Sequence, residues 1–249
     1  MAIIIKSPEE IAIMRQAGRV LAKVLQALTG RIRSGMRTQE MDDICAQELA
    51  RHEVKPSFKG YRGFPANLCV SVNDEVVHGI PGERILADGD IVSLDVGTIF
   101  KGFQSDAAVT VGVGEISQDA KRLIEVTQNA LWAGIAQARH GAHLGDVSAA
   151  IQHYVESRGF SVVREYTGHG IGRQMHEEPQ IPNFGLSGKG PLLREGMTLA
   201  IEPMVNIGEW NTRVCDNQWT VVTADGSLSA HFEHTIAITD AEPEVLSVL

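Results

Sequence analysis

The sequence has few cysteines and few aromatic residues, and it lacks any long apolar run. Only 3 of its 249 residues are cysteine, and none of them forms a Cys-x-x-Cys pair. This number and spacing argue against a disulfide framework or a zinc knuckle and favour a reducing compartment. No apolar stretch approaches the ~20 residues of a membrane helix. We therefore expect a globular cytoplasmic protein with no membrane partner.

Positive charge is also scarce. The chain has 22 Lys and Arg residues against 31 Asp and Glu residues, for a net charge of −9. Nucleic acid, which is bound mainly through phosphate contacts, is therefore not expected as the primary ligand. The opening residues MAIIIKSPEEI carry charges at Lys6, Glu9 and Glu10 and do not resemble a signal peptide. No exposed apolar stripe stands out, so we expect a monomer.

The spacing of apolar residues predicts helices in both halves of the chain. Ser7 and Pro8 are typical of a helix start, and Thr29–Gly30 of its end. Further helices are predicted over 39–52, 119–139 and 145–158. Strands are predicted over 68–72, 91–96 and 106–113.

A weak internal similarity relates the two halves. The segments LADGDIVSLDV (86–96) and LREGMTLAIEP (193–203) align without a gap and place Asp95 on Glu202. A duplicated α-α-β-β unit would put both acids on related strands that face a shared cleft, and chance similarity is the alternative. We expect an α+β fold with a single domain, 1–249, made of two pseudo-symmetric halves at roughly 1–115 and 116–249.

The most informative feature is a pair of acids, Asp95 and Asp106, on either side of a short break in a strand-like stretch. If the chain reverses near Phe100–Lys101, the two lie opposite each other with Cβ atoms about 4.5–5.5 Å apart. Two carboxylates about 4 Å apart repel by about 4 kcal/mol at an effective dielectric of about 20. Such a pair on an apolar sheet predicts a bound cation.

Three more residues could ligate a metal. His169 lies between two glycines, Glu202 ends an apolar run, and Glu233 begins a β-like segment. Taken singly, each has an ordinary explanation as a loop histidine, a strand cap or a solvated carboxylate. Together with Asp95 and Asp106 they give four carboxylates and one imidazole, whose charge balances two divalent cations. The combination therefore predicts a two-metal site.

The chain also resembles a known family along nearly its whole length. The resemblance lies in SVNDEVVHGIPG, DIVSLDVG, GFQSDAAVTVGVG, YTGHGIGRQMHEEPQIPNFG, LREGMTLAIEPM and FEHTIAIT. In these motifs it resembles the methionine aminopeptidases of the short bacterial type I form. The resemblance implies the pita-bread fold, with two αβ halves and a curved antiparallel sheet around a central dinuclear metal cleft.

The resemblance also implies roles for individual residues. It makes metal ligands of Asp95, Asp106, His169, Glu202 and Glu233, with Asp106 and Glu233 bridging the two ions. It places His78 and His176 in the cleft, where they contact the scissile amide. The expected metal is Co, Mn, Fe or Zn, because carboxylate-rich sites with one histidine accept all four.

The resemblance identifies the pocket for the methionine side chain less directly than the metal ligands. The positions at or near the family's pocket are Phe58, Tyr61, Phe64, Cys69 and Trp219. Aromatic rings and a soft sulfur suit a flexible thioether. A single aromatic residue is nevertheless more often part of a core, and both interpretations stay open at this point.

The expected activity is removal of the N-terminal methionine from nascent proteins and peptides with a small second residue, which makes the ribosome a candidate partner. Hydroxide activated by two metals would attack the scissile carbonyl. Glu202 would move protons, His176 would polarise the carbonyl, and His78 would donate to the departing amide nitrogen. These three are the expected catalytic residues.

Two alternatives stay open. Xaa-Pro peptidases and prolidases share this fold and ligand set but usually carry a sizeable additional N-terminal domain, for which 249 residues leave no room. Some pita-bread proteins are non-catalytic binding modules that have lost metal ligands. All five candidate ligands are present here, which weighs against that alternative.

Overall fold

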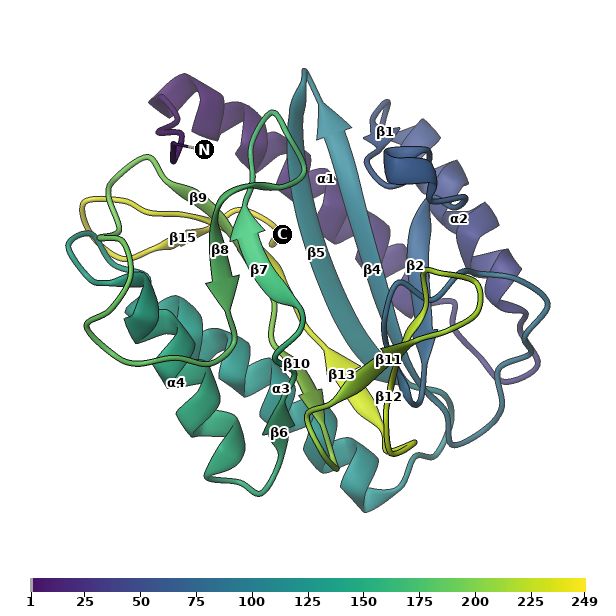
Figure 1. Ribbon diagram of the computed structural model, residues 1–249. Helices are drawn as coiled ribbons and strands as arrows, with labels where there is room; N and C mark the ends of the chain where they lie inside the picture. Colours follow the sequence, from purple (N-terminus) through teal and green to yellow (C-terminus); the bar gives the residue numbers. More distant parts are fainter. Residues whose placement is uncertain (1) are drawn as a thin grey trace.

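The computed structural model describes residues 2–249 and shows helices packed against antiparallel sheets (Figure 1). The helices of the described chain are α1 (Pro8–Thr29), α2 (Thr38–Arg51), η1 (a short 3₁₀ helix, Tyr61–Gly63), α3 (Gln118–Gln137) and α4 (Leu144–Glu156). All four predicted α-helices are confirmed to within two residues at each end. Within residues 2–249, no helix has the length and apolar character needed to cross a membrane.

The start of α1 shows why the sequence predicts it well. The Ser7 hydroxyl accepts a hydrogen bond from the Glu10 backbone N–H at 3.3 Å, and the Glu10 carboxylate accepts one from the Ser7 N–H at 3.0 Å. This reciprocal capping box satisfies two backbone donors that have no partner within the helix. Pro8 then occupies the first turn, where its missing N–H costs nothing.

The strands within residues 2–249 form four sheets. The first contains β1 (Lys55–Pro56), β2 (Leu68–Val72), β4 (Ile91–Phe100) and β5 (Phe103–Gly112), with β4 between β1 and β2 and paired also to β5. The second runs in the order β15 (Glu244–Val245), β14 (His234–Ala237), β9 (Thr198–Ile201), β7 (Thr167–Gly170) and β8 (Glu177–Pro182). The third joins β13 (Ser229–His231), β10 (Met204–Asn206) and β6 (Ser161–Val162). The fourth joins β11 (Thr212–Val214), β12 (Val221–Thr223) and β3 (Glu75–Val77).

The register of β4 and β5 corrects one prediction. The reversal is the two-residue turn Lys101–Gly102, so Asp95 pairs with Ala108, and Asp106 pairs with Gly97. Both turn residues have positive φ, at 48° and 80°. A two-residue hairpin turn of this kind needs positive φ at both positions, which favours glycine at one of them. The observed turn lies one residue later than the predicted one, and this moves the partner of each β4 residue by two positions along β5. The two acids are therefore diagonal neighbours on the same face and do not lie opposite each other.

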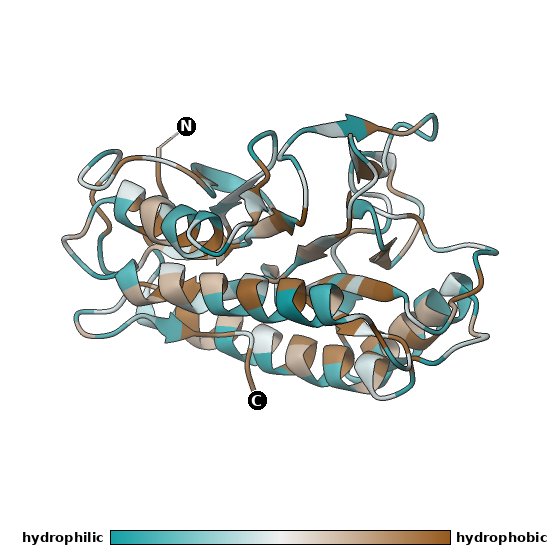
Figure 2. Cartoon of the chain, turned by 90° about the horizontal axis from the view of Figure 1, so that it is seen from below, coloured by the Kyte–Doolittle hydropathy of each residue, from teal (hydrophilic) through white to brown (hydrophobic). Residues whose placement is uncertain are grey.

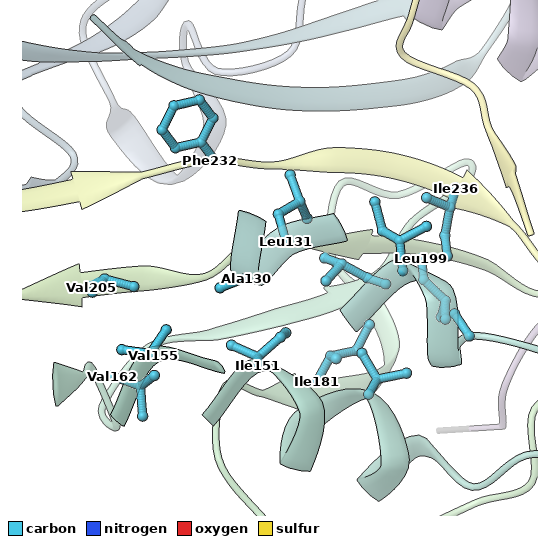
Figure 3. Packing of buried hydrophobic residues seen from close by; sticks show 14 of the residues in the cluster. Ala130, Leu131, Ile151, Val155, Val162, Ile181, Leu199, Val205, Phe232 and Ile236 are labelled. Atoms are coloured by element: carbon cyan, nitrogen blue, oxygen red, sulfur yellow. The ribbon is translucent and has the colours of Figure 1, made fainter. Parts of the chain in front are cut away.

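Each pair of helices packs against its own set of strands and contributes to its own hydrophobic core. Helices α1 and α2 pack behind β2, β4 and β5 (Figure 1). Helices α3 and α4 pack against strands of the later sheets, where Leu131, Ile151, Leu199 and Ile236 meet (Figure 3). Seen from below, most of the helices lie on one side of the strands, and each carries both hydrophobic and hydrophilic residues (Figure 2). The division into halves near residue 115 stays a prediction.

Candidate metal and substrate site

Strand alternation aims the two acids away from the first pair of helices. Leu94 and Val96 of β4 point into the core beneath α1 and α2, so the intervening Asp95 points to the opposite face. Asp106 of β5 lies on that same opposite face, across from Gly97. Asp95 and Asp106 lie close enough that each carboxyl group affects the pKa of the other. Diagonal neighbours on a sheet face are within reach of each other, so the pair predicted from the sequence does form.

The second half of the chain brings the other three residues to this face. Glu233 comes directly before β14, and its backbone N–H donates to Ala108 O of β5 at 2.9 Å. His169 lies in β7 and pairs with Ala200 of β9. Glu202 follows β9 directly. Three separate strands therefore deliver one ligand-type side chain each to the sheet face that carries the acid pair.

The five side chains form one cluster. His169 Nε2 lies 3.7 Å from Glu202 Oε1 and 4.0 Å from Asp106 Oδ2. Among the described residues, Asp106, His169 and Glu233 have ligand atoms within 4.8 Å of one another, which is close enough to hold a single ion. Asp95 joins this group through its contact with Asp106. The structure thus brings together all five candidate ligands predicted from the sequence.

Burial of like charges governs the electrostatics of the cluster. Burial, opposed by hydrogen bonds from Asp106 and Cys69, raises the pKa of Asp95 to about 7. Burial, followed by repulsion from neighbouring carboxylates, raises the pKa values of Asp106, Glu202 and Glu233 well above their usual range. Without a cation, this cluster favours protonated carboxyl groups.

The unpartnered atoms in the cluster fit a metal. Asp95 Oδ1, Asp106 Oδ1 and Glu233 Oε1 are buried without a hydrogen-bond partner. Within residues 2–249, neither lysine nor arginine forms an ion pair with any carboxylate of the cluster. Buried polar atoms are normally paired, and buried charges are paired or coordinate metals. Carboxylate oxygens with one imidazole are also ligands that divalent transition metals accept.

Two further histidines line the same pocket. His78 has a φ of 60°, the left-handed region that few side chains adopt, and burial lowers its pKa to about 4. The Nδ1 of His176 lies 2.9 Å from the Tyr61 hydroxyl, and the two rings stack. The His176 ring also lies 4.3 Å from the His169 ring. Both cleft histidines predicted from the sequence therefore lie beside the acidic cluster.

The residues predicted for the methionine side chain lie in the pocket too. Phe58, Phe64 and Trp219 form a run of edge-to-face aromatic contacts, with ring centroids 6.5 and 5.1 Å apart. Tyr61 and Cys69 complete the set. Cys69 also pairs with Asp95 across β2 and β4, so this pocket residue lies directly beside the acidic cluster. Which of these residues contact a substrate stays a prediction.

Sequence reasoning did not assign three residues near the site. Arg62 and Met175 line the pocket. His231 is buried, and its Nε2 lies 3.6 Å from Glu202 Oε2. The spacing of His231 and Glu233 is a weak signal for this position, because such a pair is common by chance. Nothing in the sequence indicates a role for Arg62, apart from its position next to Tyr61.

Taken together, a helix-backed pita-bread fold and a buried cluster of carboxylates and histidine define a metal-dependent hydrolase as the class of protein. The family model of metallopeptidase family M24 matches residues 12–240. The chain belongs to this family.

Named relatives cover almost the whole chain. It is 52% identical to a methionine aminopeptidase of Clostridium perfringens, over 99% of each chain. It is 51% identical to methionine aminopeptidase 1 of Bacillus subtilis, over 98% of this chain and 99% of the relative. A crystal structure of methionine aminopeptidase from Thermotoga maritima superposes with a TM-score of 0.98 at 48% identity, with full coverage of both chains.

A more distant likeness bears on the Xaa-Pro alternative. Prolidase from Pyrococcus furiosus superposes with a TM-score of 0.81 at 21% identity. The match covers 99% of this chain but 66% of the prolidase. This likeness shows the shared pita-bread fold alone.

Proposed function

We propose that the protein is a metal-dependent aminopeptidase that removes N-terminal methionine from peptides and proteins. The observation that carries the proposal is an aromatic pocket that opens directly onto the buried acidic cluster. Relatives that bear the name methionine aminopeptidase, about half identical over nearly full length, support the same activity.

Five residues would hold the metal. These are Asp95, Asp106, His169, Glu202 and Glu233, and their four carboxylates balance two divalent ions of Co, Mn, Fe or Zn. When bound, such ions supply Lewis acidity, which polarises a carbonyl group and makes water more acidic. The carboxylate atoms without partners support this assignment.

The chain's own residues have distinct tasks around the scissile bond. Glu202 accepts a proton on its carboxylate from the attacking water and passes it on. His176 donates a hydrogen bond to the carbonyl oxygen while Tyr61 holds its other ring nitrogen. His78, kept neutral by burial, donates a hydrogen bond through its ring N–H to the departing amide nitrogen, which receives its proton from Glu202.

The shape of the pocket supports an exopeptidase. Asp106 and Glu233 are buried, and Asp95 and Asp106 stand on the paired strands β4 and β5, so we infer that the sheet closes this end of the pocket. A chain terminus can reach these groups, whereas the middle of a peptide would have to pass through the sheet. The rings of Phe58, Phe64 and Trp219 in the same pocket then receive the first side chain, and methionine suits rings and a soft sulfur.

The test compares two peptide series on purified protein. Met-Ala-Ser should be cleaved to Met and Ala-Ser, and Ala-Pro-Ser should not. Chelation should abolish cleavage, and metal analysis should give two ions per chain after reconstitution. Cleavage of the Xaa-Pro peptide alone would favour the prolidase alternative, and no cleavage by the metal-loaded protein would favour a binding module.

Monomeric state and ribosome association stay predictions, which sedimentation and ribosome pelleting would test.

A further inference from the structure

A buried ion pair joins the N-terminal segment to the strand that follows His176. Lys6 Nζ lies 2.5 Å from Glu177 Oε2, and both side chains are 3% exposed. The Lys6 backbone N–H also donates to Gly196 O at 2.8 Å, so the segment that carries this charge is fixed at its backbone too. The partners are 171 residues apart in the chain. The pair lies outside the candidate ligand set.

The other oxygen of Glu177 holds a turn. Glu177 Oε1 accepts a hydrogen bond from the Gln174 backbone N–H at 3.1 Å. The residues enclosed between this donor and acceptor are Met175 and His176, which both line the pocket. One carboxylate thus fixes the turn that presents two pocket side chains, and Lys6 fixes that carboxylate.

The absence of a side chain at Gly172 makes room for the pair. A Cβ added there would lie 2.5 Å from Lys6 Cε and 2.6 Å from Glu177 Oε1. The Gly172 backbone is itself fixed, because its carbonyl accepts a hydrogen bond from the Gln104 N–H at 2.7 Å. The slot for the pair is therefore built by three segments that are distant in sequence.

Stability alone is a weak explanation for such a pair. Desolvation of two charges offsets most of their attraction, and replacement of a buried ion pair by apolar side chains is often neutral or stabilising. A bidentate carboxylate does provide a fixed orientation for the backbone that it binds. Because Glu177 directly follows His176 in the chain, the backbone that this carboxylate orients includes the backbone of His176.

We propose that Lys6 and Glu177 are positioning residues for His176. The pair holds the turn Gln174–Glu177 so that the His176 ring stays between Tyr61 and His169, at the place where the scissile carbonyl would lie. This inference rests on the proposed function for its kinetic consequence. The ring position itself does not depend on the substrate.

The test uses three variants that disturb the pair in different ways. Lys6→Met with Glu177→Leu replaces both charges by apolar groups. Glu177→Gln keeps an oxygen for the Gln174 N–H but leaves the lysine without a charged partner. Gly172→Ala displaces the pair without changing either charge. Each should lower kcat on Met-Ala-Ser by about tenfold or more with KM changed less than threefold, because a hydrogen bond to the reacting carbonyl matters most in the transition state.

A second measurement reports the environment of the His176 ring directly. Histidine-selective nitrogen NMR of the zinc-loaded protein should show the His176 signals displaced in all three variants, with the assignment made from His176→Gln. The matched control is Arg15→Met with Glu244→Leu, which removes an ion pair that joins α1 to β15 away from the pocket. This control should leave kcat and the His176 signals unchanged.

The outcomes separate this inference from the proposed function. Unmoved His176 signals and unchanged kcat in the variants that fold would overturn the positioning role. Displaced signals with no wild-type cleavage of Met-Ala-Ser would reject the proposed activity and leave the structural role in place. A loss of kcat matched by an equal loss of folded protein in circular dichroism, with unmoved signals from the folded fraction, would also overturn it.

Discussion

Thr235 holds the backbone of Asp106 from both sides. Its Oγ1 accepts from the Asp106 N–H at 2.9 Å and donates to the Asp106 carbonyl at 2.8 Å. Because Thr235 lies in β14 and Asp106 in β5, this pair of bonds joins the first sheet to the second. The backbone of this acid is therefore fixed independently of its carboxylate.

We predict that Asp106→Asn abolishes turnover without unfolding the chain. A neutral amide is a poor replacement for a bridging carboxylate, and activity should fall by more than about 100-fold. The metal-free variant should melt no lower than metal-free wild type, because a neutral amide avoids the burial and repulsion that raise the pKa of the Asp106 carboxyl group well above its usual range. Metal content, turnover on Met-Ala-Ser and thermal melts check this.

Asp240→Asn is the matched control for Asp106→Asn, since that carboxylate is exposed. It should keep full metal content and full rate. Wild-type turnover by Asp106→Asn with one metal or none bound would contradict the two-metal proposal.

Loss of the His78 ring should affect the rate more than metal binding. We predict that His78→Ala lowers kcat by about 10²–10⁴-fold, the usual contribution of a positioned acid or base. His78→Asn should behave similarly while tolerating the positive φ. Exposed His153 on α4 offers a neutral control through His153→Ala. If the metal is lost in proportion to activity, His78 acts as a ligand and the assignment is wrong.

The second residue of the substrate should be small. His78, His176 and the acidic cluster crowd the region beyond the scissile bond. A clash of about 1–3 kcal/mol is typical of overpacking, and each 1.36 kcal/mol is about tenfold in rate. We therefore expect kcat/KM for Met-Gly, Met-Ala and Met-Ser peptides to exceed that for Met-Leu, Met-Lys and Met-Glu peptides by about tenfold to a hundredfold. A flat profile would show that this side of the pocket is open.

The three thiols should differ sharply in reactivity. Cys45 and Cys69 are buried, whereas Cys215 is partly exposed. Burial also raises the pKa of the Cys45 thiol, which lowers its thiolate fraction at neutral pH. Titration with a disulfide reagent should modify one thiol per native chain quickly and all three in denaturant. Cys215→Ser should remove the fast phase, and a second fast thiol in that variant would contradict the expected burial.

Asp225 should contribute to stability against acid. Hydrogen bonds from Ser227 and from the Glu209 N–H lower the pKa of Asp225 to about 2, below its unfolded value of about 3.8. A group whose pKa is depressed by folding stabilises the protein above its unfolded pKa and loses that effect as pH falls through the folded pKa. The wild type should therefore melt above Asp225→Asn at pH 5, and the gap should shrink between pH 4 and pH 2. A gap that is constant over this range would rule out the linkage.

Local signals in the sequence predict the helices because their determinants are local. The Ser7 cap and the apolar spacing after it lie within one segment, and α1 begins and ends where they indicate. The register of β4 and β5 depends on which two residues make the turn, and Lys101 at positive φ gives no clear signal. The predicted acid pair survives this error because a shift of two residues keeps both side chains on one face.

Long-range pairings mark the limit of sequence reasoning. The motifs around His169, Glu202 and Glu233 indicate a metal site, but nothing in the sequence shows that Glu233 reaches it by pairing with Ala108 of another sheet. The ion pair of Lys6 and Glu177 is still harder to foresee, since one lysine and one glutamate 171 residues apart have no shared pattern.

At His78, the residue that would best suit the backbone conformation differs from the residue that activity requires. A non-glycine residue held in the left-handed region costs about 1–3 kcal/mol, which the surrounding contacts must offset. Glycine at this position would remove that strain together with the imidazole. A library selected only for heat resistance should therefore accumulate glycine at residue 78 and lose turnover, whereas selection for growth that depends on processing should retain histidine.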